Sequence, residues 1–393
     1  MEPLANPPLV ATPPSTTVFT PDTEFGSRLL VEVVRGCANL CRFCWAGYNY
    51  LPVRAFPADR ILTIARAARA HASRIGLVSI ALCDHPEIDR LLSELLAMGY
   101  SISPASLRLD DLTEPIVRIL RESGERSITI APETGSDRLR RVINKTMTND
   151  EILDRADLIF RCGIENLKLY FMIGLPTETD EDLQGIVDLV KRIVALPRAG
   201  RRLTLNVSVS PFVPRAHTPF QWQRQCSMEE IAEKERFLRE RLRHRSVQLS
   251  LRDPQLCALE GVFARGTKRL WPALVAAFER GCRFEGWRDN LDFGMWESIL
   301  AEHGMTLDGL LSGIPVDEEP PWERFGSRVS REFLLSAGTA LLGAVLASSL
   351  LPGATAAISV PSVPPVASLV AAPTSSTIRL VRVADDGCGI SQT

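Results

Sequence analysis

Short apolar, β-branched runs alternate along the chain with longer segments whose apolar residues recur at the helical period. The runs predict strands at 29–34, 75–82, 100–104, 127–131, 166–173 and 203–208. The longer segments predict helices at 58–71, 86–98, 112–122, 137–162 with an interruption, 179–196 and 228–244. Six strand-then-helix units imply parallel strands joined by right-handed crossovers. The pattern predicts an α/β fold, a partial (β/α)6 barrel of the TIM type, with an open doubly wound sheet as the alternative.

Several helix ends carry sequence signals of their own. Thr148 followed by Glu151 predicts a capping box, and Thr179 before Asp182 is a weaker example. Pro86 suits the first position of a helix. Glycines stand where three of the helices should stop, at Gly99, Gly124 and Gly163. In either architecture ligands should bind at the carboxyl ends of the strands.

Composition divides the chain into four parts. Residues 1–27 are rich in Pro and Thr and predict a disordered arm before a core barrel at 28–250. Residues 251–332 hold four of the six tryptophans among glycine-broken helical stretches, and predict a small helical C-terminal extension. Residues 333–378 contain no charged residue. We interpret 333–393 as a low-complexity apolar tail, and membrane contact through it as the alternative.

Charge and cysteine content limit the classes of function. Lys and Arg number 45 and Asp and Glu 47, so a net charge of −2 gives no support for bulk electrostatic binding of nucleic acid. Three of the nine cysteines lie within eight residues and the others are scattered, which is unlike a disulfide framework. No secretory signal is recognisable at the N-terminus. These features predict a cytoplasmic protein with a metal site.

The three close cysteines are Cys37, Cys41 and Cys44, spaced C-x3-C-x2-C directly after the first predicted strand. A structural zinc site and a ferredoxin-type cluster each normally use four protein ligands. Three thiolates on a [4Fe–4S] cluster would leave one iron open to a further ligand. Zinc with a distant fourth ligand such as Cys83 is the alternative.

This motif, in a loop after the first strand of a βα barrel, resembles that of the radical S-adenosylmethionine (SAM) superfamily. The resemblance implies that the open iron binds SAM and that an electron from the cluster cleaves SAM to a 5′-deoxyadenosyl radical. That radical would abstract hydrogen from a substrate that the sequence does not identify. A low-potential donor of the flavodoxin or ferredoxin type is implied. Phe43 matches the aromatic position near the adenine of SAM.

The same resemblance gives roles to polar residues and a glycine at the later strand ends. Asp84 is the candidate for the SAM amino group, or else a cap of the following helix. Ser106 and Arg108 could reach the ribose or carboxylate of SAM, or form a turn and a surface charge. Glu133 would bind ribose hydroxyls or substrate, and Gly174 would let the backbone approach the adenine.

Three further residues are candidates for catalysis. Lys168 and Tyr170 alternate toward one face of a predicted strand, which could be the barrel interior. His217 lies in a loop stiffened by three prolines and could transfer protons near neutral pH. A surface lysine and a locally hydrogen-bonded histidine are the ordinary alternatives.

Longer stretches resemble the cobalamin-binding type of radical SAM protein. They include "CRFCWAGYNYLPVR", "APETGSDRLRRVINK" and "LKLYFMIGLPTETDEDL". That group typically carries a cobalamin domain before the barrel, whereas only 27 residues precede the barrel here and no Asp-x-His-x-x-Gly segment occurs. Three functions follow: a radical SAM enzyme without cobalamin, a methyltransferase using a cobalamin module in trans, and a non-catalytic iron–sulfur electron-transfer or scaffold protein.

Overall fold

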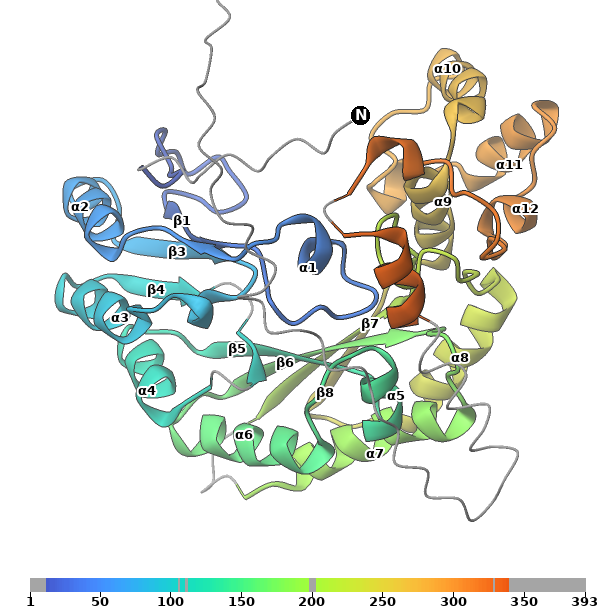
Figure 1. Cartoon of the computed structure of the whole chain (residues 1–393). Coiled ribbons are helices and arrows are strands. Elements are labelled where there is room, and N and C mark those ends of the chain that lie inside the picture. The colour runs from blue at the N-terminus through green and yellow to red at the C-terminus, as the bar shows by residue number, and fades with distance from the viewer. Residues whose placement is uncertain (1–11, 105–106, 110–111, 198–202, 328, 339–393) are drawn as a thin grey trace, which may run out of the picture. The chain divides into compact units, whose positions relative to one another are not determined.

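The computed structural model describes residues 12–104, 107–109, 112–197, 203–327 and 329–338. Its strands form two four-stranded sheets, with the orders β2-β1-β3-β4 and β5-β6-β7-β8 (Figure 1). The first sheet comprises β1 (Leu29–Arg35), β2 (Arg54–Ala55), β3 (Arg74–Ser79) and β4 (Ser101–Pro104). The second comprises β5 (Ser127–Glu133), β6 (Asn166–Ile173), β7 (Thr204–Pro211) and β8 (Val247–Leu251). All neighbouring strands are parallel except β1 and β2.

The predicted α/β architecture is confirmed as a partial barrel of the TIM type, but with two strands more than the sequence indicated, the short antiparallel β2 and the parallel β8. All six predicted strands form, and β8 adds a seventh parallel strand beside β7. Residues Val247–Leu251 alternate between half-buried and exposed positions, so they lack the continuous apolar run that marks the other strands. Among the described residues, β4 and β5 belong to separate sheets.

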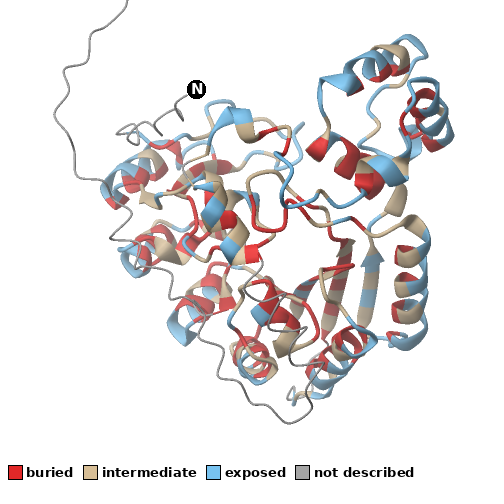
Figure 2. Ribbon diagram, turned by 45° about the vertical axis from the view of Figure 1, so that its right-hand side comes forward, coloured by how far each residue is buried: buried red, intermediate tan, exposed pale blue. Residues whose placement is uncertain are grey.

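Helices follow nearly every strand, and most of them, though not α1 and α5, cover the outer face of the sheets (Figure 1). These helices are α1 (Trp45–Asn49), α2 (Ala58–Ala68), α3 (Ile88–Ala97), α4 (Glu114–Glu122), α5 (Asp137–Val142), α6 (Asn149–Arg161), α7 (Asp180–Ala195) and α8 (Met228–Arg241). Leu167, Leu169 and Phe171 of β6 are buried in the core between strands and helices. Their neighbours Lys168 and Tyr170 are exposed on the opposite, inner face (Figure 2 shows this alternation of burial along the strands).

The predicted helix ends are mostly confirmed. Thr148 and Thr179 each form a complete capping box, with Glu151 and Asp182 respectively. Gly99, Gly124 and Gly163 have positive φ angles after their helices. The expectation for Pro86 is wrong, because α3 begins at Ile88 with Glu87 as its N-cap residue.

The segments flanking the barrel have defined contacts. Part of the predicted arm lies along β1, where the Thr16 amide donates to the Leu30 carbonyl over 2.9 Å. The extension contains α9 (Pro254–Arg265), α10 (Trp271–Glu279), α11 (Phe293–Glu302) and α12 (Leu307–Leu311), which enclose an apolar cluster of their own. Residues 331–338, which include the first six residues of the expected tail, are helical, and 339–393 lie outside the described residues. Within the described segments, no helix is both long and apolar enough to cross a membrane.

Candidate functional site

The three close cysteines lie in a loop, residues 36–44, that leaves the carboxyl end of β1; we call it the cysteine loop. It opens on Gly36, whose φ of +97° is a left-handed conformation. A Cβ atom at Gly36 would lie 2.6 Å from the Tyr50 carbonyl oxygen. The loop then turns so that the Cys44 amide donates to the Cys41 carbonyl over 2.9 Å. Its path therefore requires glycine at position 36.

Side-chain hydrogen bonds between the cysteine loop and neighbouring segments hold the loop in place. The Asn144 amide nitrogen Nδ2 donates to the carbonyls of Asn39 and Leu40 over 3.1 and 3.0 Å. The Tyr48 hydroxyl donates to the Leu40 carbonyl over 2.6 Å. Arg42, buried between the second and third cysteines, donates to the carbonyl of Val142 over 2.9 Å. The backbone of the loop is thus fixed from both sides before any ligand binds.

The three thiols are close enough to influence one another electrostatically. Burial raises the pKa of the Cys41 thiol to about 12, against the opposing effect of the Lys145 ammonium. Burial also raises the pKa of Cys44, and hydrogen bonds from the Gly47 and Ala46 amides to its sulfur work in the other direction. No group of three His, Cys, Asp or Glu side chains in the described ranges is arranged around a single metal ion.

The donor set can be compared with the two kinds of metal site that the sequence leaves open. A zinc site needs its ligands to converge on one ion. Thiolates that hold a cubane cluster bind different irons, so their sulfurs stay apart. Three thiols in one pinned loop, with backbone amides directed at one sulfur, fit the donor set of such a cluster.

Glu133 at the end of β5 is paired with a residue that the sequence analysis missed. The Lys145 ammonium lies 2.9 Å from the Glu133 carboxylate, and both side chains are 14% exposed. Burial opposes the charge on Lys145, but the charges of Glu133 and Cys41 outweigh it and raise the pKa of Lys145. A buried cation therefore stands beside the cysteines. The only sequence signal was its place at the end of a long motif.

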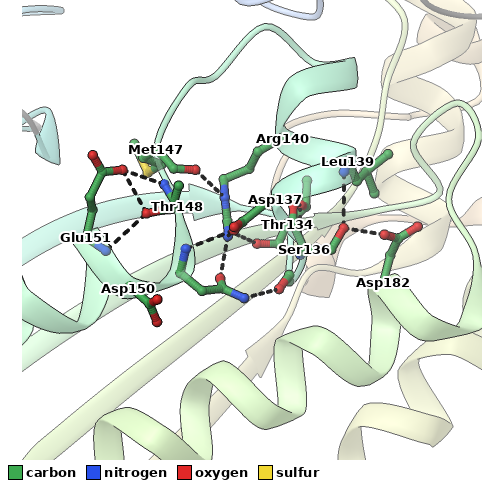
Figure 3. A network of polar contacts seen from close by, with 12 residues as sticks. Thr134, Ser136, Asp137, Leu139, Arg140, Met147, Thr148, Asp150, Glu151 and Asp182 are labelled. Atoms are coloured by element: carbon green, nitrogen blue, oxygen red, sulfur yellow. Dashed lines mark hydrogen bonds and ion pairs between the residues drawn. The ribbon is translucent and has the colours of Figure 1, made fainter. Parts of the chain in front are cut away.

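A buried arginine organises the segment between Glu133 and Lys145 (Figure 3). Arg140 is fully buried and donates to the carbonyls of Thr134 and Met147 over 2.6 and 2.9 Å. It also contacts the Asp137 carboxylate at 2.6 Å and the Asn149 side chain. Guanidinium groups suit this task because they present several donors in a fixed plane. The network joins the end of β5 to α5 and α6, and so positions the Lys145 segment between them.

The start of α5 is fixed by a second set of contacts in the same network (Figure 3). Ser136 is its N-cap and accepts from the Leu139 amide over 3.1 Å. The Ser136 hydroxyl and the Arg138 guanidinium both contact the buried carboxylate of Asp182 on α7. Burial opposes the charge on Asp182, but these hydrogen bonds and that of the Thr179 amide together lower the pKa of its carboxyl.

Asp84 and Arg108, which the sequence analysis placed at separate strand ends, form an ion pair of 2.8 Å. Arg108 also donates to the Asn39 side chain of the cysteine loop over 3.3 Å. Asp84 is not the N-cap of α3, since Glu87 holds that position. Ser106 lies outside the described residues.

The remaining cofactor candidates are Phe43 and Gly174. Phe43 is partly buried and packs against an apolar cluster that includes Leu139 and Phe212, so it contributes to the stability of the fold. The space that a side chain at Gly174 would need is occupied by Cys226, whose sulfur lies 2.9 Å from the Cβ position. Close packing against Cys226 thus gives a structural reason for this glycine.

The three catalytic candidates lie on two segments, β6 and the loop after β7. Lys168 and Tyr170 are exposed on the inner face of β6, as expected for residues that line an open interior. The His217 amide donates to the Gln221 side chain over 2.8 Å. Burial lowers the pKa of His217, with Glu323 of the C-terminal extension opposing, and so favours the neutral imidazole.

Comparison with known sequences assigns the family. The sequence profile of the radical SAM superfamily matches residues 31–190, which include all three cysteines, Glu133 and Lys145. Residues 31–190 therefore form a domain of the radical SAM superfamily. Members of this superfamily are enzymes that use a [4Fe–4S] cluster and SAM.

Relatives of this radical SAM protein include "Uncharacterized protein MJ0966" of Methanocaldococcus jannaschii. It is 30% identical over 302 residues, which are 72% of this chain and 65% of that protein. A tRNA-2-methylthio-N(6)-dimethylallyladenosine synthase of Fervidobacterium nodosum is 25% identical over 41% of this chain and 40% of its own. The chain therefore spans less than two thirds of either relative.

Among solved structures, the cobalamin-dependent SAM radical enzyme OxsB with aqua-cobalamin bound gives a TM-score of 0.38. The identity is 12%, over 82% of this chain and 55% of that one.

Proposed function

We propose that this radical SAM protein is an enzyme that holds a [4Fe–4S] cluster on Cys37, Cys41 and Cys44. The observation that carries the proposal is the conjunction of three thiols in one pinned loop with the buried Glu133–Lys145 pair beside them. When bound, the cluster supplies the electron that cleaves SAM reductively. The residues of the chain position SAM and exclude water around it.

The charges around the cysteine loop suit a zwitterionic ligand. Lys145 provides a buried positive charge for the carboxylate of SAM, and Glu133 provides acceptors for an amino group or for hydroxyls. Arg108 and Asp84 form a second pair of opposite charges, joined to the loop through Asn39. Charged groups that the fold already holds in place need little rearrangement when a ligand binds, so less of the binding free energy is spent on reorganisation.

The inner face of β6 is the best-supported place for the substrate. Lys168 and Tyr170 project there from a strand whose other face is buried, and they leave a polar, open surface. The barrel of a typical TIM fold is instead filled with branched apolar side chains. We therefore propose that the substrate presents polar groups to these residues.

The decisive experiment is anaerobic reconstitution with iron and sulfide, followed by SAM and dithionite. We expect about four irons per chain, an EPR signal of a reduced cubane cluster, and 5′-deoxyadenosine. Cys37→Ala should lose the signal and the product together, whereas the matched control Cys162→Ala should keep both. A cluster that leaves SAM intact would contradict the proposal and favour the electron-transfer or scaffold function.

The same assay separates the cobalamin alternative. S-adenosylhomocysteine formed only on addition of cobalamin, or of a cobalamin-binding protein, would identify a methyltransferase that uses cobalamin in trans. Replacing dithionite with flavodoxin or ferredoxin tests the proposed electron donor. We propose a cytoplasmic location, because a low-potential cluster and free thiols require a reducing environment.

A further inference from the structure

A helix at residues 331–338 packs against the cysteine loop, at the place where the sequence predicts the start of a low-complexity apolar tail. Leu334 is 2% exposed and lies in one apolar cluster with Leu40, Tyr48 and Trp222. Phe333 and Leu335 pack against the same cluster from partly buried positions. The helix thus covers the residues that shape the loop between its first two cysteines.

The helix also reaches the loop between its second and third cysteines. Arg42 is 5% exposed, and its Nε donates to the carbonyl of Ala337, 295 positions along the chain. Its Nη1 donates to the carbonyls of Arg141 and Val142 over 3.0 and 2.9 Å. The acceptors that the structure gives to this buried guanidinium are therefore backbone carbonyls of two distant segments.

Backbone bonds complete the arrangement. The Arg42 amide donates to the Ile143 carbonyl over 2.9 Å, and its carbonyl accepts from the Phe220 amide over 3.2 Å. At Gly338, the last described residue of the helix, a Cβ atom would lie 2.7 Å from the Pro219 carbonyl oxygen. The helix, the end of α5 and the segment after β7 therefore meet around one residue of the loop.

We infer that helix 331–338 is a clamp on the cysteine loop and that Arg42 is the positioning residue through which it acts. A buried cation that loses one acceptor carries a desolvation cost, so departure of the helix would loosen Arg42 and the loop together. The inference rests on the proposed function in that the clamped loop is the one that would hold the cluster. The start of the apolar C-terminal segment would thus support the loop that holds the cluster.

The first test uses the cluster-free full chain, so that it does not depend on the proposed function. Hydrogen exchange is followed in peptides covering residues 36–44, for the parent, Leu334→Ala and Glu332→Ala. Glu332 is exposed on the same helix and serves as the matched control. We expect Leu334→Ala to speed exchange in the loop by about tenfold, with no change in the control and no change in peptides of β6.

The second test measures cluster retention after reconstitution. Arg42→Gln should lose at least half of the bound iron on gel filtration and should show a broadened EPR signal. Arg42→Lys should show the same two defects, because lysine cannot reach three carbonyls at once. Arg236→Gln, at an exposed arginine on α8, is the charge-matched control. Unchanged exchange in the loop of Leu334→Ala would overturn the clamp, whatever the cluster content of the parent. Parent-like cluster retention and EPR signal in Arg42→Gln would overturn the role of Arg42 while leaving the proposed function in place.

Discussion

The ammonium of Lys145 lies 2.9 Å from the carboxylate of Glu133, and the two groups are equally buried. The charges of Cys41 and Cys44 also act on Lys145, so the pair belongs electrostatically to the cysteine loop. A ligand that carries both charges can pair with Lys145 and with Glu133 at once. Neither buried charge is then left without a partner when the ligand binds.

Lys145→Met is expected to weaken SAM binding at least tenfold and to lower the free energy of unfolding by about 2–4 kcal/mol, because Glu133 would be left without its partner. Equilibrium binding of SAM and urea unfolding measure the two effects. Lys191→Met, at an exposed lysine on α7, should change neither quantity. Parent-like affinity in Lys145→Met would rule out a direct role for this cation.

Replacing each cysteine of the loop by alanine should abolish retention of iron and sulfide, because two thiolates cannot hold a cubane cluster against exchange. The apo chains of Cys41→Ala and Cys44→Ala should remain folded, since these two cysteines are only partly buried. Circular dichroism and metal analysis separate the two effects. Cys83→Ala should bind iron as the parent does, and loss of metal in that variant would revive the four-ligand zinc site.

Asp182→Asn should destabilise the fold by roughly 1–3 kcal/mol at pH 7, an estimate reduced because the Arg138 partner is 35% exposed. The pKa of Asp182 is lowered in the folded chain, so its contribution is present above the ordinary pKa of an aspartate. It is lost as the pH falls through the lowered value.

Urea unfolding between pH 7 and pH 3 should therefore show the difference between parent and Asp182→Asn shrinking with acidification. Asp188→Asn, at an exposed aspartate on the same helix, is the control. A difference that stays constant down to pH 3 would show that lost packing, and not lost charge, explains the effect.

Gly36→Ala should impair both stability and cluster retention, because the new Cβ would meet the Tyr50 carbonyl at 2.6 Å. Gly281→Ala is an informative control, since Gly281 has a similar φ of +93° but nothing within 4 Å of its Cβ position. Both variants carry the left-handed strain of about 1–2 kcal/mol, and thermal unfolding should detect it in each. Only Gly36→Ala should also lose iron.

Sequence periodicity was sufficient for the barrel because strand and helix periods differ clearly in this chain. The buried residues of β6 recur at every second position, and the helix N-caps Thr148 and Thr179 have local signals that do not depend on tertiary contacts. β8 was missed because two of its five residues are exposed and the other three are only half-buried. Strands at the margin of a sheet bury too little apolar surface to produce a strong pattern.

The cysteines could be predicted from spacing alone, but the partners around them could not. The contacts of Arg42 with Ala337 and of Asn144 with Asn39 join residues separated by 295 and 105 positions. No local pattern marks a residue whose role is to reach a distant carbonyl. The same limit explains why Asp84 and Arg108 were assigned separate roles, although they form one ion pair.

The cysteine loop starts in the sheet that contains β1 and is held by α5, which follows β5 of the other sheet. Because β4 and β5 do not share a ladder among the described residues, this loop is one of the bridges between the two halves. Whatever occupies the loop should therefore fasten the halves of the barrel to each other, and a cofactor that prefers the folded chain stabilises it by mass action. Binding of a cofactor in the cysteine loop and attachment of the two halves of the barrel to each other are therefore thermodynamically coupled.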